Sequence, residues 1–213
     1  LLLALLIIGC VFAQDQKHSL FDGISISLGF NSSQIRGNLD DKIFLEGQDE
    51  NHKVGLIYGW QKKLKNNWRV EFGIVMRGAV YGYSKGFSVN KTSIQLNYVK
   101  LILSKPYTLF NIQIPYQKNK STINFPIKLE MAFFIDGERT YKKSNFNIYN
   151  NNVSELSQLN ASKFDFGFPI GIELENVGNF SFCVDYYIGL IDIFDDVESK
   201  NHSLQLYLRY QFS

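Results

Sequence analysis

The feature that most constrains the fold is a strict alternation of apolar and polar residues near the C-terminus. Between residues 202 and 212 every second position is large and apolar: Leu204, Leu206, Leu208, Tyr210 and Phe212. The positions between them are Ser203, Gln205, Tyr207, Arg209 and Gln211. A period of two places these sets on opposite faces of an extended strand, and no helical period of 3.6 residues fits them. The segment therefore predicts a β-strand with one apolar and one polar face.

The same alternation recurs along the chain and predicts a sheet of eight strands. It is clearest in six further segments, which are residues 24–30, 54–61, 68–77, 123–133, 164–174 and 180–190. The segment 93–117 is ambiguous, because 94–103 and 107–116 would each make a strand and raise the number to nine. Single-chain bacterial outer-membrane barrels normally have an even number of strands. We therefore interpret 93–117 as one long, bent strand, whose second half is the better membrane-crossing piece.

The connections between these strands alternate between short and long. Short turns are expected near residues 65–67, 117–121 and 176–179, and longer polar loops near 32–51, 84–92, 137–162 and 191–201. In outer-membrane barrels the short turns face the periplasm and the long loops face the outside. The sequence thus predicts an all-β, eight-stranded antiparallel up-and-down transmembrane β-barrel with short periplasmic turns and longer extracellular loops.

Alternation alone does not say which face is inside, because a soluble lipocalin-like barrel has the same period. The apolar face carries more Phe, Ile and Leu than an eight-stranded interior accepts, so we expect it to face lipid. The polar face combines glycines with charges of both signs that can pair in a narrow lumen. We expect this lumen polar network to consist of Arg69, Glu71, Arg77, Lys128, Glu130, Asp165, Glu173, Asp185 and Arg209. A soluble ligand-binding barrel is the alternative interpretation.

Several aromatic residues lie close to the predicted short turns and to the C-terminus. Aromatic side chains favour the membrane–water interface, where their rings sit at the level of the lipid headgroups. We expect an interfacial girdle on the periplasmic side, formed by Trp60, Trp68, Phe180, Tyr210 and Phe212.

The N-terminal segment is typical of a secretory signal peptide. Residues 1–11 are almost wholly apolar but only about half as long as a membrane-spanning helix. Val11-Phe12-Ala13 suits signal peptidase cleavage before Gln14, although the initiating Met and basic start of such a peptide are missing. We therefore predict an N-terminally truncated signal peptide at residues 1–13 and one outer-membrane β-barrel domain at residues 14–213.

An alternative for this segment is a lipoprotein cleavage box at Ile7-Ile8-Gly9-Cys10, after which Cys10 would be lipidated. If cleavage instead follows Ala13, Cys183 is the one cysteine that remains. An intramolecular disulfide is then impossible.

Charge and motifs argue against several functional classes. The net charge of +2 provides no basic stripe for nucleic acid. No Walker loop, dinucleotide fingerprint, zinc pattern or Gly-x-Ser-x-Gly elbow is present, and we expect no cofactor and no metal. The spacing of the acidic residues Asp192, Asp195, Asp196 and Glu198 does not match an EF-hand loop.

The three histidines, His18, His52 and His202, lie at or outside the predicted strand ends. A membrane-embedded lipid-modifying enzyme could use His202 with Ser203, or His52 with Glu50, as a base and its partner. We treat solvated histidines at loop edges as the simpler interpretation.

With these strands placed, the sequence resembles the PorT-like outer-membrane β-barrel family of the Bacteroidota type. The segments that carry the resemblance are Gly23–Asn31, Lys53–Gly59, Val70–Gly78 and Leu206–Phe212. They are patterns of glycine and alternation, whereas the terminal Ser213 departs from the usual aromatic last residue. The resemblance implies an outer-membrane location, and some members of the family are associated with protein secretion.

We therefore expect a small outer-membrane barrel that acts as a non-enzymatic scaffold or binding component of the cell envelope. Its expected partners are outer-membrane lipid and an envelope or secretion protein. A small pore and a membrane-embedded lipid-modifying enzyme are the alternative functions.

Overall fold

A computed structural model describes residues 23–37, 49–85, 88–113, 115, 120–145, 148–155, 162–194 and 198–212. Its strands are β1 (Ile24–Gly37), β2 (Asp49–Lys63), β3 (Arg69–Lys85), β4 (Ser88–Ile112), β5 (Ser121–Asn145), β6 (Ile148–Glu155), β7 (Phe164–Val177), β8 (Phe180–Gly189) and β9 (Ser199–Gln211). A short 3₁₀ turn, η2 (Lys65–Asn67), joins β2 to β3. Within these ranges no helix has the length and apolarity needed to cross a bilayer. The predicted signal peptide and Cys10 lie outside the described residues.

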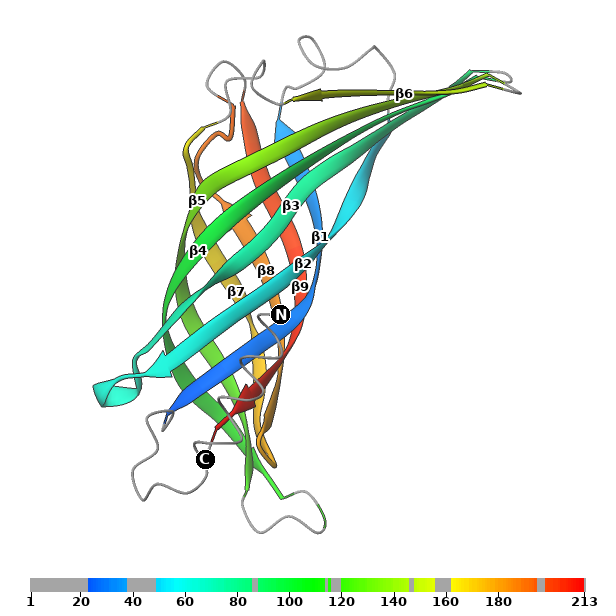
Figure 1. Ribbon diagram of the computed structural model, residues 1–213. Coiled ribbons are helices and arrows are strands. Elements are labelled where there is room, and N and C mark those ends of the chain that lie inside the picture. Colours follow the sequence, from blue (N-terminus) through cyan, green and yellow to red (C-terminus); the bar gives the residue numbers. More distant parts are fainter. Residues whose placement is uncertain are drawn as a thin grey trace, which may run out of the picture.

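Eight of the strands close into an antiparallel barrel (Figure 1). Each barrel strand pairs with its neighbour in the chain, and β1 pairs with β9 to close the ring. β5 is followed in the ring by β7, because β6 folds back on the outer part of β5. The predicted eight-stranded antiparallel barrel is confirmed.

The predicted short turns at residues 65–67 and 176–179 are confirmed, and both lie at the end of the barrel where β1 begins and β9 ends, here called the side of the chain ends. Ser25 at the start of β1 pairs with Gln211 at the end of β9. In η2, Asn66 and Asn67 have φ angles of 59° and 63°. Asparagine tolerates this left-handed conformation better than most residues, so the sequence favours a tight reversal here.

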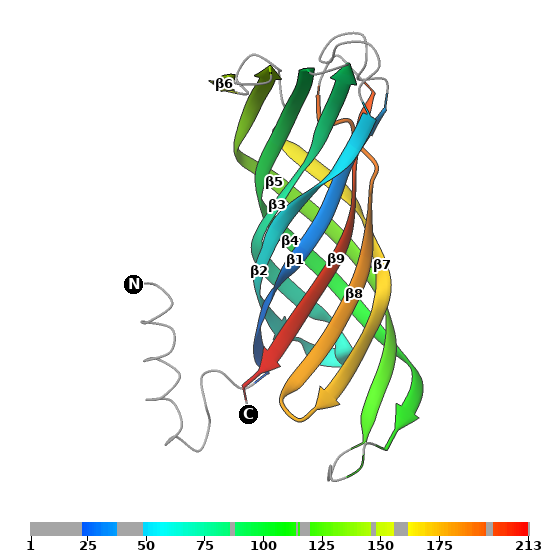
Figure 2. The ribbon, with the colours of Figure 1, turned by 90° about the vertical axis from the view of Figure 1, so that its right-hand side faces the viewer.

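Residues 93–112 of the segment 93–117 lie in one strand, as interpreted, but the prediction about the second half of the segment is wrong. β4 pairs with β3 only as far as Ser104, which lies opposite Arg69. Beyond that point it pairs with β5 alone, and Tyr107 to Ile112 are exposed. Figure 2 shows this β4–β5 end reaching beyond the turn between β7 and β8. The first half is the part that forms the barrel wall.

The predicted loops at 84–92 and 137–162 are wrong in large part, because strands run through both. β3 and β4 remain paired up to Lys85 and Ser88, and β5 continues to Asn145 before β6 returns along it. Figure 1 shows β3, β4, β5 and β6 leaving the barrel together as an extended sheet. An antiparallel hairpin satisfies its own backbone hydrogen bonds, so these strands form without the alternation that a barrel wall requires.

The outer wall of the barrel is apolar. Large side chains such as Leu28, Phe30, Ile127 and Phe182 have between 51% and 63% of their surface exposed. Soluble monomers rarely expose a contiguous apolar surface of more than a few hundred Å². The apolar face therefore lies against lipid, in a closed antiparallel barrel of the kind that spans bacterial outer membranes. A soluble lipocalin-like barrel is contradicted, because its apolar face would point inward.

Candidate functional site

The interior of the barrel is filled by a charged layer toward the chain ends and an apolar layer toward the opposite end. All nine residues of the expected lumen polar network are buried in it, with exposures of 5% or less: Arg69, Glu71, Arg77, Lys128, Glu130, Asp165, Glu173, Asp185 and Arg209. They come from β3, β5, β7, β8 and β9, and the closed sheet aims their inward-facing positions at one another.

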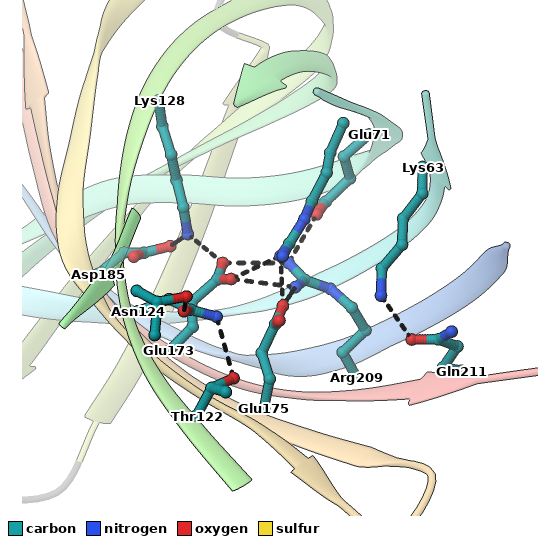
Figure 3. A network of polar contacts seen from close by, with 12 residues as sticks. Lys63, Glu71, Thr122, Asn124, Lys128, Glu173, Glu175, Asp185, Arg209 and Gln211 are labelled. Atoms are coloured by element: carbon teal, nitrogen blue, oxygen red, sulfur yellow. Dashed lines mark hydrogen bonds and ion pairs between the residues drawn. The ribbon is translucent and has the colours of Figure 1, made fainter. Parts of the chain in front are cut away.

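Glu173 of β7 is the centre of the charged layer (Figure 3). Arg69 Nη1 donates to its Oε2 at 2.8 Å, and Lys128 Nζ lies 2.9 Å from its Oε1. Arg209 approaches both carboxylate oxygens at 3.4 Å. One carboxylate thus binds three cations from β3, β5 and β9.

Lys128 connects Glu173 to a second acidic group on β8. Its Nζ lies 2.7 Å from Asp185 Oδ2 and 2.9 Å from the Tyr207 hydroxyl. The Tyr207 hydroxyl in turn donates to Asp185 Oδ2 at 2.7 Å. Charge-assisted hydrogen bonds of this length hold side chains in fixed positions.

Two members of the charged layer were not predicted from the sequence, Lys100 of β4 and Glu175 of β7. Lys100 Nζ donates to Glu71 Oε1 at 2.7 Å, and Glu175 forms an ion pair with Arg69. Lys100 falls within the segment whose strand pattern was ambiguous. Glu175 follows Glu173 at a spacing of two, so extending the alternation of that strand by one step could have found it.

Arg77 of β3 forms a second ionic group further along the lumen. Its Nη1 donates to Asp165 Oδ2 at 3.1 Å, and its Nη2 pairs with Glu130. Its guanidinium carbon lies 3.6 Å from the centre of the Tyr187 ring, a cation–π contact. Asn201 Nδ2 also donates to Asp165 Oδ2, at 2.8 Å. Arg77 and its two carboxylates have no exposed side-chain surface.

An apolar cluster fills the part of the lumen around Arg77 and toward its outer end, which the sequence analysis did not predict. Its inward-facing residues include Ile35, Ile57, Val75, Ala79, Tyr81, Ile94 and Leu96, each buried to at least 97%. Ile193 and Phe194, which follow β8, pack into the same cluster and are only 2% exposed. Phe194 N donates to Ser199 Oγ at 3.1 Å, and Ser199 N donates to Asp192 Oδ1 at 2.8 Å. The segment after β8 therefore contributes side chains that fill the outer end of the lumen.

Over the described residues, the interior is a packed core in which five cations lie among six carboxylates. Lys100, Lys128, Arg69, Arg77 and Arg209 each form at least one ion pair with a carboxylate inside the barrel. Over the residues that the structure describes, no three His, Cys, Asp or Glu side chains gather as metal ligands would. Asp195 and Asp196 lie outside the described residues.

The His202–Ser203 pair considered for catalysis is not assembled. His202 faces outward on β9, whereas Ser203 faces the lumen and is 1% exposed, because neighbouring residues of a strand point to opposite faces. His52 is exposed on β2. The side chain of Glu50 and all of His18 lie outside the described part of the chain. Cys183 is a buried free thiol that faces the lumen.

The residues expected to form the aromatic girdle lie on the outer wall toward the chain ends. Tyr210 has ring centres 5.2 Å from both Phe180 and Phe212, and Trp60 stacks on Phe72 at 6.3 Å. Trp68 is 38% exposed, and Lys105 Nζ lies 5.6 Å from the centre of its ring. Their role at the membrane interface stays a prediction.

Comparison with solved structures finds small surface barrels of low sequence identity. The chain is similar to Neisserial surface protein A (NspA), at 12% identity and a TM-score of 0.49, over 90% of this chain and 98% of that one. It is similar to Ail, the attachment invasion locus protein of Yersinia pestis, at 13% identity and a TM-score of 0.40, over 90% and 99% of the two chains. It is also similar to the outer membrane protein OprG of Pseudomonas aeruginosa, at 11% identity and a TM-score of 0.43, over 90% of this chain and 96% of that one.

No protein-family model matches the chain, and no curated protein matches it in sequence. The fold therefore rests on the molecule itself, namely a closed eight-stranded barrel with an apolar outer wall and a charged interior. The protein is a small β-barrel of the outer membrane.

Proposed function

We propose that this barrel is a non-enzymatic scaffold or binding component of the cell envelope, whose binding surface is the sheet that extends beyond the barrel. The proposal rests on one observation: β3, β4, β5 and β6 extend together beyond the barrel as one sheet (Figure 1). Nine residues of β5 follow Asp136, which corresponds to roughly 30 Å of strand at 3.3 Å per residue.

An extended sheet of this kind offers backbone groups to a partner. β6 pairs with β5 along one edge, from Glu138–Glu155 to Asn145–Ile148. Within the described residues no strand pairs with the other edge of β6. Extended segments of other proteins bind such edges by adding a strand to the sheet. The resemblance to PorT-like proteins favours a secretion or other envelope protein as the partner.

The filled lumen favours this function over that of a pore. Arg77, with its two carboxylates and the Tyr187 ring, occupies the middle of the lumen, and Ile193 and Phe194 fill its outer end. A conducting barrel of eight strands would need space that these side chains occupy. The separation of His202 from Ser203 disfavours the catalytic pair considered for a lipid-modifying enzyme.

The test is site-specific photo-crosslinking in living cells. A crosslinking residue placed at Asn150 on β6 is compared with one placed at Lys65 in the turn at the opposite end of the barrel. We expect one defined crosslinked protein from position 150 and not from position 65, and its loss when residues 148–155 are replaced by a Gly-Ser linker of equal length. Heat-modifiable mobility on a gel shows that the linker variant still folds. Identical crosslinks from both positions, or a crosslink that survives the replacement, would contradict the proposal.

A further inference from the structure

Two cations face outward on the barrel wall at the end where the apolar surface stops. On the outer face of β1, Leu28 and Phe30 are 63% and 62% exposed. The same face continues through Ser32 and Gln34 to Arg36, because outward positions recur every second residue. Arg36 is exposed and lies at the end of the barrel opposite the chain ends.

The neighbouring strand shows the same transition from apolar to basic. On β9, Leu206 and Leu204 are 51% and 43% exposed, and the same face continues to His202 and Lys200. The register of the two strands places Gln34 opposite His202 and Arg36 opposite Lys200. Arg36 and Lys200, the outer-rim cation pair, are therefore side by side directly above an apolar surface that faces lipid.

Within the part of the chain that the structure describes, carboxylates compensate the positive charge of this pair only partly. Like charges on directly opposite residues of neighbouring strands repel each other. Glu198 Oε1 lies 3.7 Å from Lys200 Nζ, and that carboxylate side chain is 61% exposed. Among the described residues no carboxylate forms an ion pair with Arg36, whose guanidinium lies against the Gln34 side-chain amide.

A cation on the outer wall near the opposite end of the barrel has partners of a different kind. Lys105 Nζ lies 5.6 Å from the Trp68 ring and 5.8 Å from the Tyr107 ring. Aromatic faces stabilise a cation without an anion. The outer-rim cation pair has no such rings among the described residues, so its charge is available to an external group.

We propose that Arg36 and Lys200 bind the phosphate of an anionic lipid of the outer leaflet, with Gln34 and His202 beside them. A guanidinium matches phosphate in charge and in the geometry of its paired donors. Leu28, Phe30, Leu204 and Leu206 supply the adjoining surface for acyl chains. Continuity with this lipid-facing wall selects a lipid as the occupant. This inference goes beyond the proposed scaffold function, since it concerns a different face of the barrel and needs no protein partner.

The experiment uses the full chain in nanodiscs of phosphatidylcholine that contain a small fraction of diphosphoryl lipid A. Native mass spectrometry counts the lipid A molecules that remain bound, and a titration gives their affinity. The test variant is R36Q/K200Q. The matched control is K65Q/K120Q, which removes two exposed lysines at the other end of the barrel. Heat-modifiable mobility verifies that every variant is folded.

We expect R36Q/K200Q to bind diphosphoryl lipid A about 25-fold more weakly, since each of the two basic residues near a lipid surface contributes about fivefold. K65Q/K120Q and the charge-conserving R36K/K200R should keep most of the affinity. Dephosphorylated lipid A should bind wild type no better than it binds R36Q/K200Q. Unchanged affinity in R36Q/K200Q, an equal loss in K65Q/K120Q, or no preference of wild type for the phosphorylated lipid would each overturn the proposal.

Discussion

Lys100 and Glu71 form an ion pair inside the barrel, with Nζ 2.7 Å from Oε1 and both side chains at most 2% exposed. Lys100 lies on β4 and Glu71 on β3, while Arg209 of β9 approaches the other oxygen of Glu71 at 3.5 Å. The pair thus connects β4, which had the least clear sequence pattern, to the charged layer of the interior. It also offers a direct test of what the buried charges contribute to stability.

Replacing Lys100 with Met is expected to lower the free energy of unfolding by about 3 kcal/mol, because Glu71 loses its shortest partner while it stays buried. Urea titration of the barrel in lipid vesicles measures this change. K105M is the control, because Lys105 lies on the outer wall and its loss should cost less than about 1 kcal/mol. The double variant K100M/E71M should regain most of the loss, since apolar residues can replace a buried pair. A double variant no more stable than K100M would contradict this account.

Gly29 is expected to tolerate no side chain, although it lies in the middle of β1. A Cβ at this position would overlap the Leu206 carbonyl oxygen and the Tyr207 backbone on β9. Those atoms belong to the β1–β9 pairing that closes the barrel. G29A should therefore cost about 2–3 kcal/mol of stability or prevent folding, as overpacking does.

The control for Gly29 is Ser27→Ala, at the preceding inward position of β1. Ser27 already carries a Cβ, and its hydroxyl makes no hydrogen bond to any residue that the structure describes. S27A should refold with the yield of wild type, as judged by heat-modifiable mobility. If G29A and wild type refold equally well, the prediction is wrong, because the barrel can then move β1 away from β9 without losing stability.

An arginine on the outer wall should lower the free energy of unfolding, and by more the deeper it lies in the membrane. Leu206→Arg is expected to destabilise the barrel by about 2–4 kcal/mol, whereas Tyr210→Arg, near the chain end, should cost about 0–1 kcal/mol. Unfolding in vesicles measures both values. In an aqueous environment L206R would instead be harmless, because Leu206 is 51% exposed. A neutral L206R would therefore contradict the assignment of this face to lipid.

The purified barrel is expected to show no steady ion conductance in planar bilayers. The variant I193S/F194S should also fail to conduct, because Arg77 and its carboxylates still fill the lumen beneath these residues. Single-channel currents from wild type would support the pore alternative. Currents from I193S/F194S alone would show that the two side chains after β8 are the barrier.

For the strands with a clear alternation, the sequence by itself determined which face meets lipid. Leu204, Leu206 and Leu208 alternate with Ser203, Gln205 and Tyr207, and this period is a local property of an extended chain. The charges between the apolar residues decided which face points into the barrel, because Arg69, Glu71 and Arg209 are stable away from water only when they pair. The turn at Lys65–Asn67 was predictable for the same local reason, since asparagines tolerate the backbone angles that it needs.

Only the tertiary structure decided which residues meet inside the barrel and where the strands end. The stagger between strands brings Lys100 to Glu71 and three cations to Glu173, and a single strand does not contain that stagger. Ile94 and Leu96 are apolar residues that face the lumen, whereas most apolar residues of the other strands face lipid. The sequence pattern of β4 therefore did not show which of its faces points inward. β3 to β6 continue past the barrel because paired backbones satisfy one another's hydrogen bonds, and that pairing requires no particular side chains.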